Sequence, residues 1–164
     1  MKILVLSDSH GRVDAMEEAV RLEQPDMIMH LGDLVRDADA LGTRCPGIPL
    51  VRVPGNCDGP SRLAGVLLYR VGGVPILLCH GHQYSVKSGY YRISLAARQE
   101  GAEVLLFGHT HVQYCEQYDG LWMLNPGACG QSGFLRYGLV TVENGHAHCC
   151  TVSEKQNPKG ADAL

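Results

Sequence analysis

The sequence predicts an α/β fold with a parallel sheet, because short apolar runs alternate with a helical pattern and end in polar residues. The first run, residues 3–6, is rich in strand formers and is followed directly by the polar segment 7–11 (SDSHG). Buried parallel strands have this composition, and open α/β sheets bind ligands beyond the carboxyl ends of their strands. Ligand-binding side chains are therefore expected along one edge of the sheet.

The elements of the first half continue this alternation. Residues 13–22 carry apolar side chains at roughly helical spacing, which predicts a helix. Further strands are predicted at 27–31 and 49–53, with a weak helix at about 38–41 between them. This strand–helix–strand order is typical of a parallel sheet.

The second half contains more strands and one further helix. Strands are predicted at 67–71 and 76–79, joined through Gly72-Gly73, and at 104–107. A helix is predicted over 88–99, with a late start because of Gly89. Two hairpins then follow, with strands 114–118 and 121–124 around Asp119-Gly120, and strands 136–142 and 146–152 around Asn144-Gly145.

The bulk properties indicate one globular domain. The chain has 164 residues, 45% of them hydrophobic and 19% charged, which suits one soluble domain over residues 1–153. The polar segment 154–164 contains Pro158 and Gly160 and is expected to be a flexible tail. A net charge of −3 without a long basic run argues against binding to a nucleic-acid polymer.

Cysteine usage and hydropathy predict a cytoplasmic location. The seven cysteines are an odd, scattered set without a CxxC pair, so a disulfide framework is not expected and a reducing compartment fits better. The apolar run at the N-terminus is too short for a signal peptide, and no later segment could span a membrane.

Five polar clusters follow predicted strands and carry the chemistry. They are Asp8-x-His10, Gly32-Asp33, Gly55-Asn56-x-Asp58, His80-Gly-His82 and Gly108-His109-Thr110-His111. One such cluster alone is more often a turn than a ligand pair. Together they place many imidazoles and carboxylates at one sheet edge, where burial requires pairing or a metal. Carboxylate, imidazole and amide ligands favour Mn²⁺, Fe²⁺ or Zn²⁺, and a carboxylate such as Asp33 can bridge two ions about 3.5–4 Å apart.

The series DSH, GD, GNCD, HGH and GHTH, in this order, resembles the calcineurin-like metallophosphoesterases. Within them it is most similar to the small YfcE-type phosphodiesterases, relatives of vacuolar sorting protein 29, over roughly residues 1–152. The resemblance implies a four-layer αββα sandwich, with two mixed sheets flanked by helices. It also implies a hydrolase, preferably a phosphodiesterase, in which a hydroxide bridging two divalent metals attacks phosphorus in line.

The resemblance further assigns the ligands. One ion would take Asp8, His10, Asp33 and His111, and the other would take Asp33, Asn56, His80 and His109, with Asp33 as the bridge. Manganese is the preferred ion, with iron, zinc, nickel and magnesium as alternatives.

The proton donor is left open by the sequence. Many relatives carry histidine where this chain has Cys57, so Cys57, His10 and His82 are all candidate catalytic residues. Asp58 is expected to orient its neighbours. His82 could equally have a structural role, and His10 could bind phosphate oxygens instead of moving a proton.

Several residues are better explained by structure than by chemistry. His30 is expected in the core, His146 and His148 on an exposed hairpin, and Cys149-Cys150 as an alternation of core and surface. Residues 125–128 (NPGA) could help close the pocket or form a simple turn. Tyr84, Tyr90 and Tyr91 could line the pocket, but helix packing is the default.

The expected substrate is a small phosphate ester. A phosphomonoesterase, a non-catalytic scaffold of the same fold and a single-metal protein are the alternatives. Exposed edge strands near the C-terminus could pair between subunits, so a homo-oligomer is possible.

Overall fold

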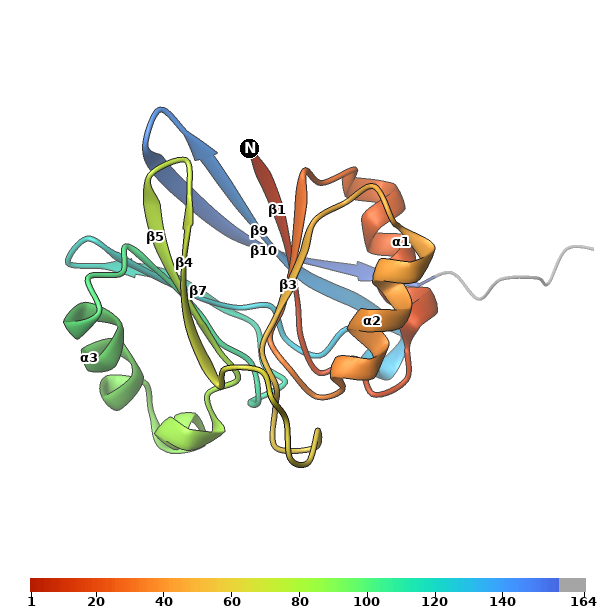
Figure 1. The fold of residues 1–164 in the computed structure, drawn as a ribbon, viewed down its shortest axis with the longest axis horizontal. Coiled ribbons are helices and arrows are strands. Elements are labelled where there is room, and N and C mark those ends of the chain that lie inside the picture. The colour runs from red at the N-terminus through yellow and green to blue at the C-terminus, as the bar shows by residue number, and fades with distance from the viewer. Residues whose placement is uncertain (157–164) are drawn as a thin grey trace, which may run out of the picture.

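A computed structural model describes residues 1–156 and contains two facing five-stranded sheets (Figure 1). The first has the order β10-β9-β1-β2-β3, from β1 (Lys2–Leu6), β2 (Met27–His30), β3 (Leu50–Arg52), β9 (Phe134–Glu143) and β10 (His146–Lys155). The second has the order β4-β5-β6-β8-β7, from β4 (Val66–Val71), β5 (Val74–Cys79), β6 (Val104–Leu106), β7 (Tyr114–Tyr118) and β8 (Leu121–Asn125). The helices are α1 (Val13–Glu23), α2 (Val35–Arg44) and α3 (Tyr91–Gln99).

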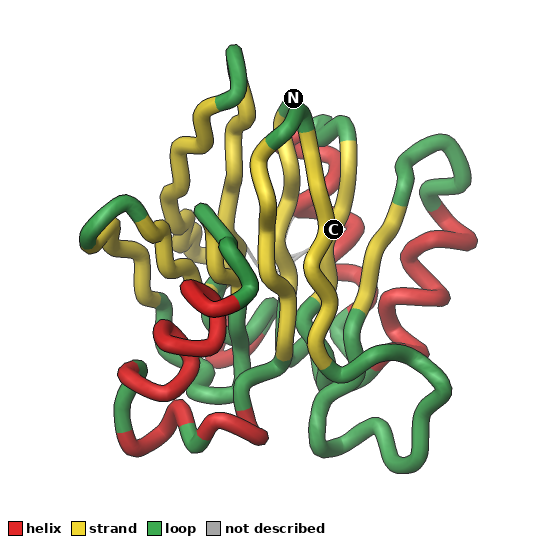
Figure 2. The backbone as a smooth tube through the Cα atoms, turned by 60° about the vertical axis from the view of Figure 1, so that its left-hand side comes forward, coloured by secondary structure: helices red, strands yellow, loops and turns green. Residues whose placement is uncertain are grey.

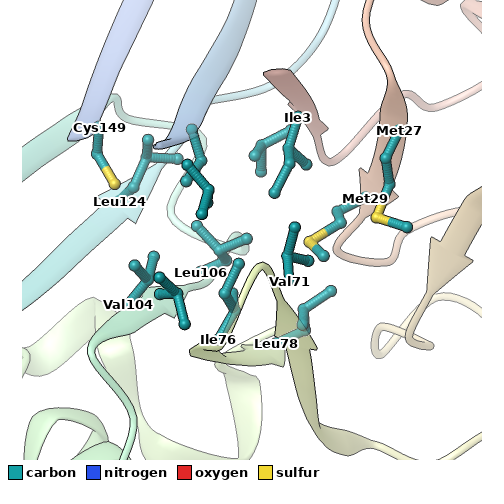
Figure 3. Close-up of a cluster of buried hydrophobic side chains, with 14 of the residues drawn as sticks. Ile3, Met27, Met29, Val71, Ile76, Leu78, Val104, Leu106, Leu124 and Cys149 are labelled. Atoms are coloured by element: carbon teal, nitrogen blue, oxygen red, sulfur yellow. The ribbon is translucent and has the colours of Figure 1, made fainter. Parts of the chain in front are cut away.

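Strand alternation sets the four layers. In β1, Ile3 and Val5 belong to the core between the two sheets, whereas Leu4 and Leu6 pack with residues of α1 on the outer face. Because successive side chains of a strand point to opposite faces, one apolar run can serve both layers. Figure 3 shows the core between the sheets, where Ile3 and Leu106 are among the labelled side chains. The helix α3 covers the outer face of the second sheet (Figure 1). The four-layer αββα sandwich is confirmed.

Both sheets are mixed. Strands β1, β2 and β3 are parallel, β9 pairs antiparallel with β1, and β10 pairs antiparallel with β9. In the second sheet β5, β6 and β8 are parallel, with antiparallel β4 and β7 at the edges. The predicted parallel pairing thus holds for β1, β2 and β3, which reach one edge of the first sheet, and for the three central strands of the second. The carboxyl ends of β1, β2, β3, β5 and β6 lie at the same edge of the sandwich, where the loops gather at the bottom of Figure 2.

The largest differences from the predicted boundaries concern three segments, and the other boundaries shift by at most two residues. The weak helix at 38–41 is longer, spanning α2 (Val35–Arg44), and it buries Asp37, Ala38 and Leu41 on one side. The helix over 88–99 begins at Tyr91, after 3₁₀ turns at His82–Tyr84 and Val86–Ser88. The predicted start of the tail at residue 154 is too early, because Glu154 and Lys155 still pair with β9. Residues 157–164 of that tail lie outside the described part of the chain.

Several predictions that concern packing are confirmed. His30 is fully buried, and Cys149 is buried while Cys150 is exposed. Tyr90 packs in the core against Phe107, with ring centroids 4.9 Å apart. Within residues 1–156, no helix is long and apolar enough to cross a membrane.

The central core should dominate stability. Leu106 is fully buried between the sheets, whereas Leu95 on α3 is 43% exposed. We expect Leu106→Ala to lower the free energy of unfolding by about 2–5 kcal/mol, because it removes buried methyl groups and leaves a cavity. Leu95→Ala is the control and should cost under about 1 kcal/mol. Urea denaturation of both variants measures this, and similar losses in the two would contradict the assignment of the core.

Candidate metal centre

Asp8 lies at the end of β1 and is held in place by its neighbours. Its Oδ2 atom accepts hydrogen bonds from Ser7 Oγ at 2.5 Å and from the backbone N–H of His109 at 3.1 Å. Gly108 permits this approach, because a Cβ there would collide with Ser7 Oγ and lie 2.8 Å from Asp8 Oδ2. Burial alone would raise the pKa of Asp8, but the adjacent imidazoles of His111 and His80 outweigh it and keep this pKa below its usual value. Asp8 is therefore a fixed, buried carboxylate.

The first group of potential metal ligands consists of Asp8, His10 and His111, whose ligand atoms all lie within 4.8 Å of one another. The Nε2 atom of His111 is 3.1 Å from Asp8 Oδ1 and 3.4 Å from the Nε2 atom of His10. The carboxylate of Asp8 raises the pKa of His111. His10 is exposed, so this group opens toward solvent.

The second group consists of Asp33, His80 and His109, again with ligand atoms within 4.8 Å. The Nδ1 atom of His80 lies 2.8 Å from the carbonyl oxygen of Leu31, which accepts its proton and leaves Nε2 with a free lone pair. That Nε2 is 3.4 Å from Asp33 Oδ2 and 3.9 Å from Asp8 Oδ1, so His80 joins the two groups. Asp33 belongs to the second group only, and its bridging role stays a prediction.

Asp58 holds the loop that carries Asp33. Its two carboxylate oxygens accept backbone N–H bonds from Asp33 at 3.1 Å, Val35 at 2.6 Å and Gly55 at 2.7 Å. The loops after β2 and β3 are thereby tied to one side chain. Gly55 is required there, because a Cβ at this position would collide with Asp33 Oδ1. Asp58 thus positions the loop, in keeping with the orienting role expected from the sequence.

The backbone at the potential ligands is unusual. Left-handed φ values occur at Asp8 (53°), His10 (45°), Asp33 (47°), His109 (68°) and His111 (61°). Residues other than glycine adopt this region infrequently, and such conformations concentrate at functional sites. The surrounding hydrogen bonds must therefore stabilise these turns.

Two buried polar atoms test whether the site suits a metal. Within residues 1–156, neither Asp8 Oδ1 nor His80 Nε2 has a well-aligned hydrogen-bond partner, although both are fully buried. Leaving such atoms unpaired costs about 1–3 kcal/mol each in the folded state. Divalent cations at the two ligand groups would give each of these atoms a partner, since carboxylate oxygen and imidazole nitrogen are both metal ligands. The donor set therefore fits divalent metal ions.

Three further predicted residues lie around the second group. Cys57 is exposed, and its backbone N–H donates to Asp33 Oδ1 at 2.9 Å. The nearby Asp33 carboxylate raises the pKa of the Cys57 thiol. Asn56 is exposed with its amide nitrogen 3.5 Å from the Cys57 sulfur, so its role as a ligand stays a prediction. His82 is exposed, and its ring centroid lies 5.4 Å from that of His80.

Asp37 on α2 holds the loop that carries His10, and it is absent from the residues predicted from the sequence. Its Oδ2 atom accepts hydrogen bonds from Ser9 Oγ at 2.8 Å and from the Gly11 N–H at 2.6 Å, on either side of His10. His30 Nε2 lies 3.4 Å from the same hydroxyl, and burial lowers the pKa of His30 to about 4. Nothing in the local sequence marks Asp37, because it occupies an ordinary position in the first turn of a polar helix.

Asn125, at the end of β8, supports the loop of His109 and His111. Its amide nitrogen donates to the Gly108 carbonyl at 2.9 Å and to Thr110 Oγ1 at 3.0 Å, and its oxygen accepts from Gly127 N–H at 2.9 Å. The NPGA segment is therefore a turn that also buttresses the site.

The sequence profile of the calcineurin-like phosphoesterase superfamily domain matches residues 1–145. The chain belongs to this family. Membership supports a hydrolase of phosphate esters as the general class of activity, and it agrees with the resemblance inferred from the five motifs. The two potential ligand groups occupy the edge where those motifs meet.

Two similar sequences and one similar structure are compared with the chain. The chain is 33% identical to the probable metallophosphoesterase YsnB of Bacillus subtilis, covering 88% of this chain and 86% of YsnB. It is 23% identical to phosphodiesterase MJ0936 of Methanocaldococcus jannaschii, covering 87% and 90%. The crystal structure of wild-type Vps29 complexed with Zn²⁺ from Entamoeba histolytica shares the fold, with a TM-score of 0.73, 21% identity and coverage of 93% and 99%.

Loss of the Asp37 carboxylate should weaken metal binding. We expect Asp37→Ala to reduce Mn²⁺ affinity about 10–100-fold, because the turn that presents His10 loses two hydrogen bonds. Asp37→Asn retains an acceptor oxygen and should recover part of the loss. Calorimetric titration with Mn²⁺ measures the affinities. The control is Asp39→Ala, on the same helix as Asp37, which removes an ion pair with Arg52 of β3. Equal affinity in Asp37→Ala and Asp39→Ala would contradict the positioning role.

Proposed function

We propose that this protein is a phosphodiesterase that uses two divalent metal ions, preferably manganese. The observation that carries the proposal is the pair of buried, unsatisfied atoms, Asp8 Oδ1 and His80 Nε2, which face each other at 3.9 Å between two ligand groups. Family membership supports the phosphoesterase class, and the similarity to an archaeal phosphodiesterase favours diesters over monoesters.

The ligands would be shared between the two groups. Asp8, His10 and His111 would hold one ion, and Asp33, Asn56, His80 and His109 the other, with Asp33 as the bridge. When bound, two such ions lower the pKa of a water molecule and neutralise charge on phosphate oxygens, which favours in-line attack on phosphorus.

The remaining polar residues handle the substrate. The exposed His10 faces the open side of the first group, where it can contact a phosphate oxygen in addition to its ligand role. Cys57 projects to solvent from a backbone bound to Asp33, a position from which its thiol can donate a proton to the leaving oxygen. His82 stands beside His80 and is suited to binding the phosphate group.

A binding scaffold of the same fold is the second candidate function, because the fold is shared with Vps29. The presence of both ligand groups favours the enzyme, since a scaffold does not require them. A measurement of phosphodiester hydrolysis distinguishes the enzyme from the scaffold.

Metal removal should abolish hydrolysis. We expect chelated protein to lose activity toward bis(p-nitrophenyl) phosphate and to regain it with Mn²⁺. Asp33→Ala should lower kcat by roughly a hundredfold or more, because a bridging ligand serves both ions. Asp39→Ala is the control and should leave the rate unchanged. Persistent activity after chelation would rule out the metal mechanism, and a lack of turnover with every metal tested would favour the scaffold.

The proton donor can be identified from the leaving group. An alkoxide needs a proton as it departs, whereas p-nitrophenolate does not. We expect Cys57→Ala to lower kcat about 100-fold for diesters with alkyl leaving groups and to have little effect on p-nitrophenyl esters. His82→Ala should instead raise KM for both substrates, and the exposed His146→Ala serves as the control. A leaving-group effect in His82→Ala, and none in Cys57→Ala, would reverse these assignments.

A further inference from the structure

A cavity of about 440 Å³ opens directly beside the first ligand group. It is lined by Asp8, Ser9, His10, Arg12, Cys129, Gly130, Gln131 and Ser132. Asp8 and His10 belong to the proposed metal site, so one wall of the cavity is the site itself. The volume falls in the range of small-molecule pockets, about 300–1,000 Å³. A phosphate bound at the metals would have one of its ester substituents within reach of this space.

The opposite wall, residues 129–132, is fastened to the body of the protein. The Cys129 N–H donates to the Ser7 carbonyl at 3.1 Å. The guanidinium of Arg12 donates to the Gly130 carbonyl at 2.8 Å and to Gln156 Oε1 at 3.3 Å. These bonds connect the wall to the loop after β1 and to the residue that follows β10. The cavity is therefore preformed.

The charge of Arg12 is already engaged at this wall. Its Nε donates to Asp14 Oδ1 at 3.3 Å, and its two terminal nitrogens hold the Gly130 carbonyl and Gln156. Arg12 thus anchors residues 129–132, and its charge is paired with Asp14. The wall formed by residues 129–132 itself carries no charged side chain. Because the Arg12 guanidinium already has these partners, this wall does not favour a second phosphate group.

The free polar groups of the wall are neutral. Gln131 and Ser132 are exposed, and within residues 1–156 their side chains make no hydrogen bond. They offer an amide and a hydroxyl, each able to donate and to accept. Among the described residues that line the cavity, the one aromatic ring is that of His10, which belongs to the first ligand group, so residues 129–132 offer no ring on which a nucleobase could stack and no long aliphatic side chain to hold an acyl chain. The wall matches a ligand with several hydroxyl groups.

We propose that this cavity binds a polyhydroxy substituent of the phosphate ester, such as a glycerol or sugar group, through Gln131 and Ser132. The proposal rests on the phosphodiesterase function and adds the substrate class to it. The phosphate lies at the ligand groups, and the hydroxyl groups exchange hydrogen bonds with the amide and the hydroxyl of the outer wall. Recognition is by hydrogen bonding and not by stacking or charge.

Two phosphate esters of matched size test the proposal. Glycerol 3-phosphate and propyl phosphate differ by two hydroxyl groups, and calorimetric titration into the Mn²⁺-loaded protein gives the Kd of each. We expect glycerol 3-phosphate to bind about tenfold more tightly, as two neutral hydrogen bonds allow. In Gln131→Ala/Ser132→Gly this ratio should fall to near one. Glycine suits position 132, where φ is 58°. Gln117→Ala, an exposed amide on β7, is the control and should keep the ratio.

Each other outcome overturns the proposal. Equal Kd values in the wild-type protein would show that the hydroxyl groups are not recognised. A tenfold ratio that survives in the double variant would place recognition elsewhere. Adenosine monophosphate binding more tightly than glycerol 3-phosphate, with a dependence on Gln131 and Ser132, would assign the cavity to nucleosides. Hydrolysis of bis(p-nitrophenyl) phosphate by the same preparation distinguishes these failures from failure of the phosphodiesterase function itself.

Discussion

The site depends on placing one carboxylate oxygen, Asp8 Oδ1, and one imidazole nitrogen, His80 Nε2, 3.9 Å apart and fully buried, where neither has a well-aligned hydrogen-bond partner in residues 1–156. Asp8 comes from the first sheet and His80 from the second, so the two orphan atoms meet where the sheets converge. A packed apolar core between the sheets fixes how closely they approach, and thus the separation of these atoms. The fold therefore buries two polar atoms that lack hydrogen-bond partners in residues 1–156, and binding of a cation can compensate for the loss of their hydration.

Several polar side chains near the site hydrogen-bond to the loops that carry the potential metal ligands. Asp58 accepts three N–H groups, Asp37 accepts from both sides of His10, and Asn125 binds the Gly108 carbonyl. These side chains make the left-handed turns at the ligand positions tolerable. The arrangement fits a site that is formed before any metal or substrate arrives, so little ordering would oppose their binding.

The sequence predicts the site best where a potential metal ligand directly follows a strand. The strand before Asp8 and the strand before His80 were visible as apolar runs, and parallel strands bring their carboxyl ends together, so the five clusters could be placed on one edge. Asp37 could not be found, because its role depends on a helix docking beside the loop after β1. The wall at Gln131 and Ser132 was equally hidden, since it is created by contacts of Arg12 across more than a hundred residues. Boundaries such as the end of β10 were missed because cross-strand pairing with β9, and not composition, sets them.

The way Asp33 is held has a consequence for how such a site can diversify. Cys57 contributes its backbone N–H to Asp33, and the neighbouring Asp58 supplies the anchoring carboxylate. The Cys57 side chain is exposed, and its sulfur contacts the exposed amide of Asn56. A thiol, an imidazole or a hydroxyl at this position would leave the backbone bond to Asp33 unchanged. The loop thus separates the backbone that anchors Asp33 from an exposed side chain, so one substitution can exchange the solvent-facing group while the anchor stays in place.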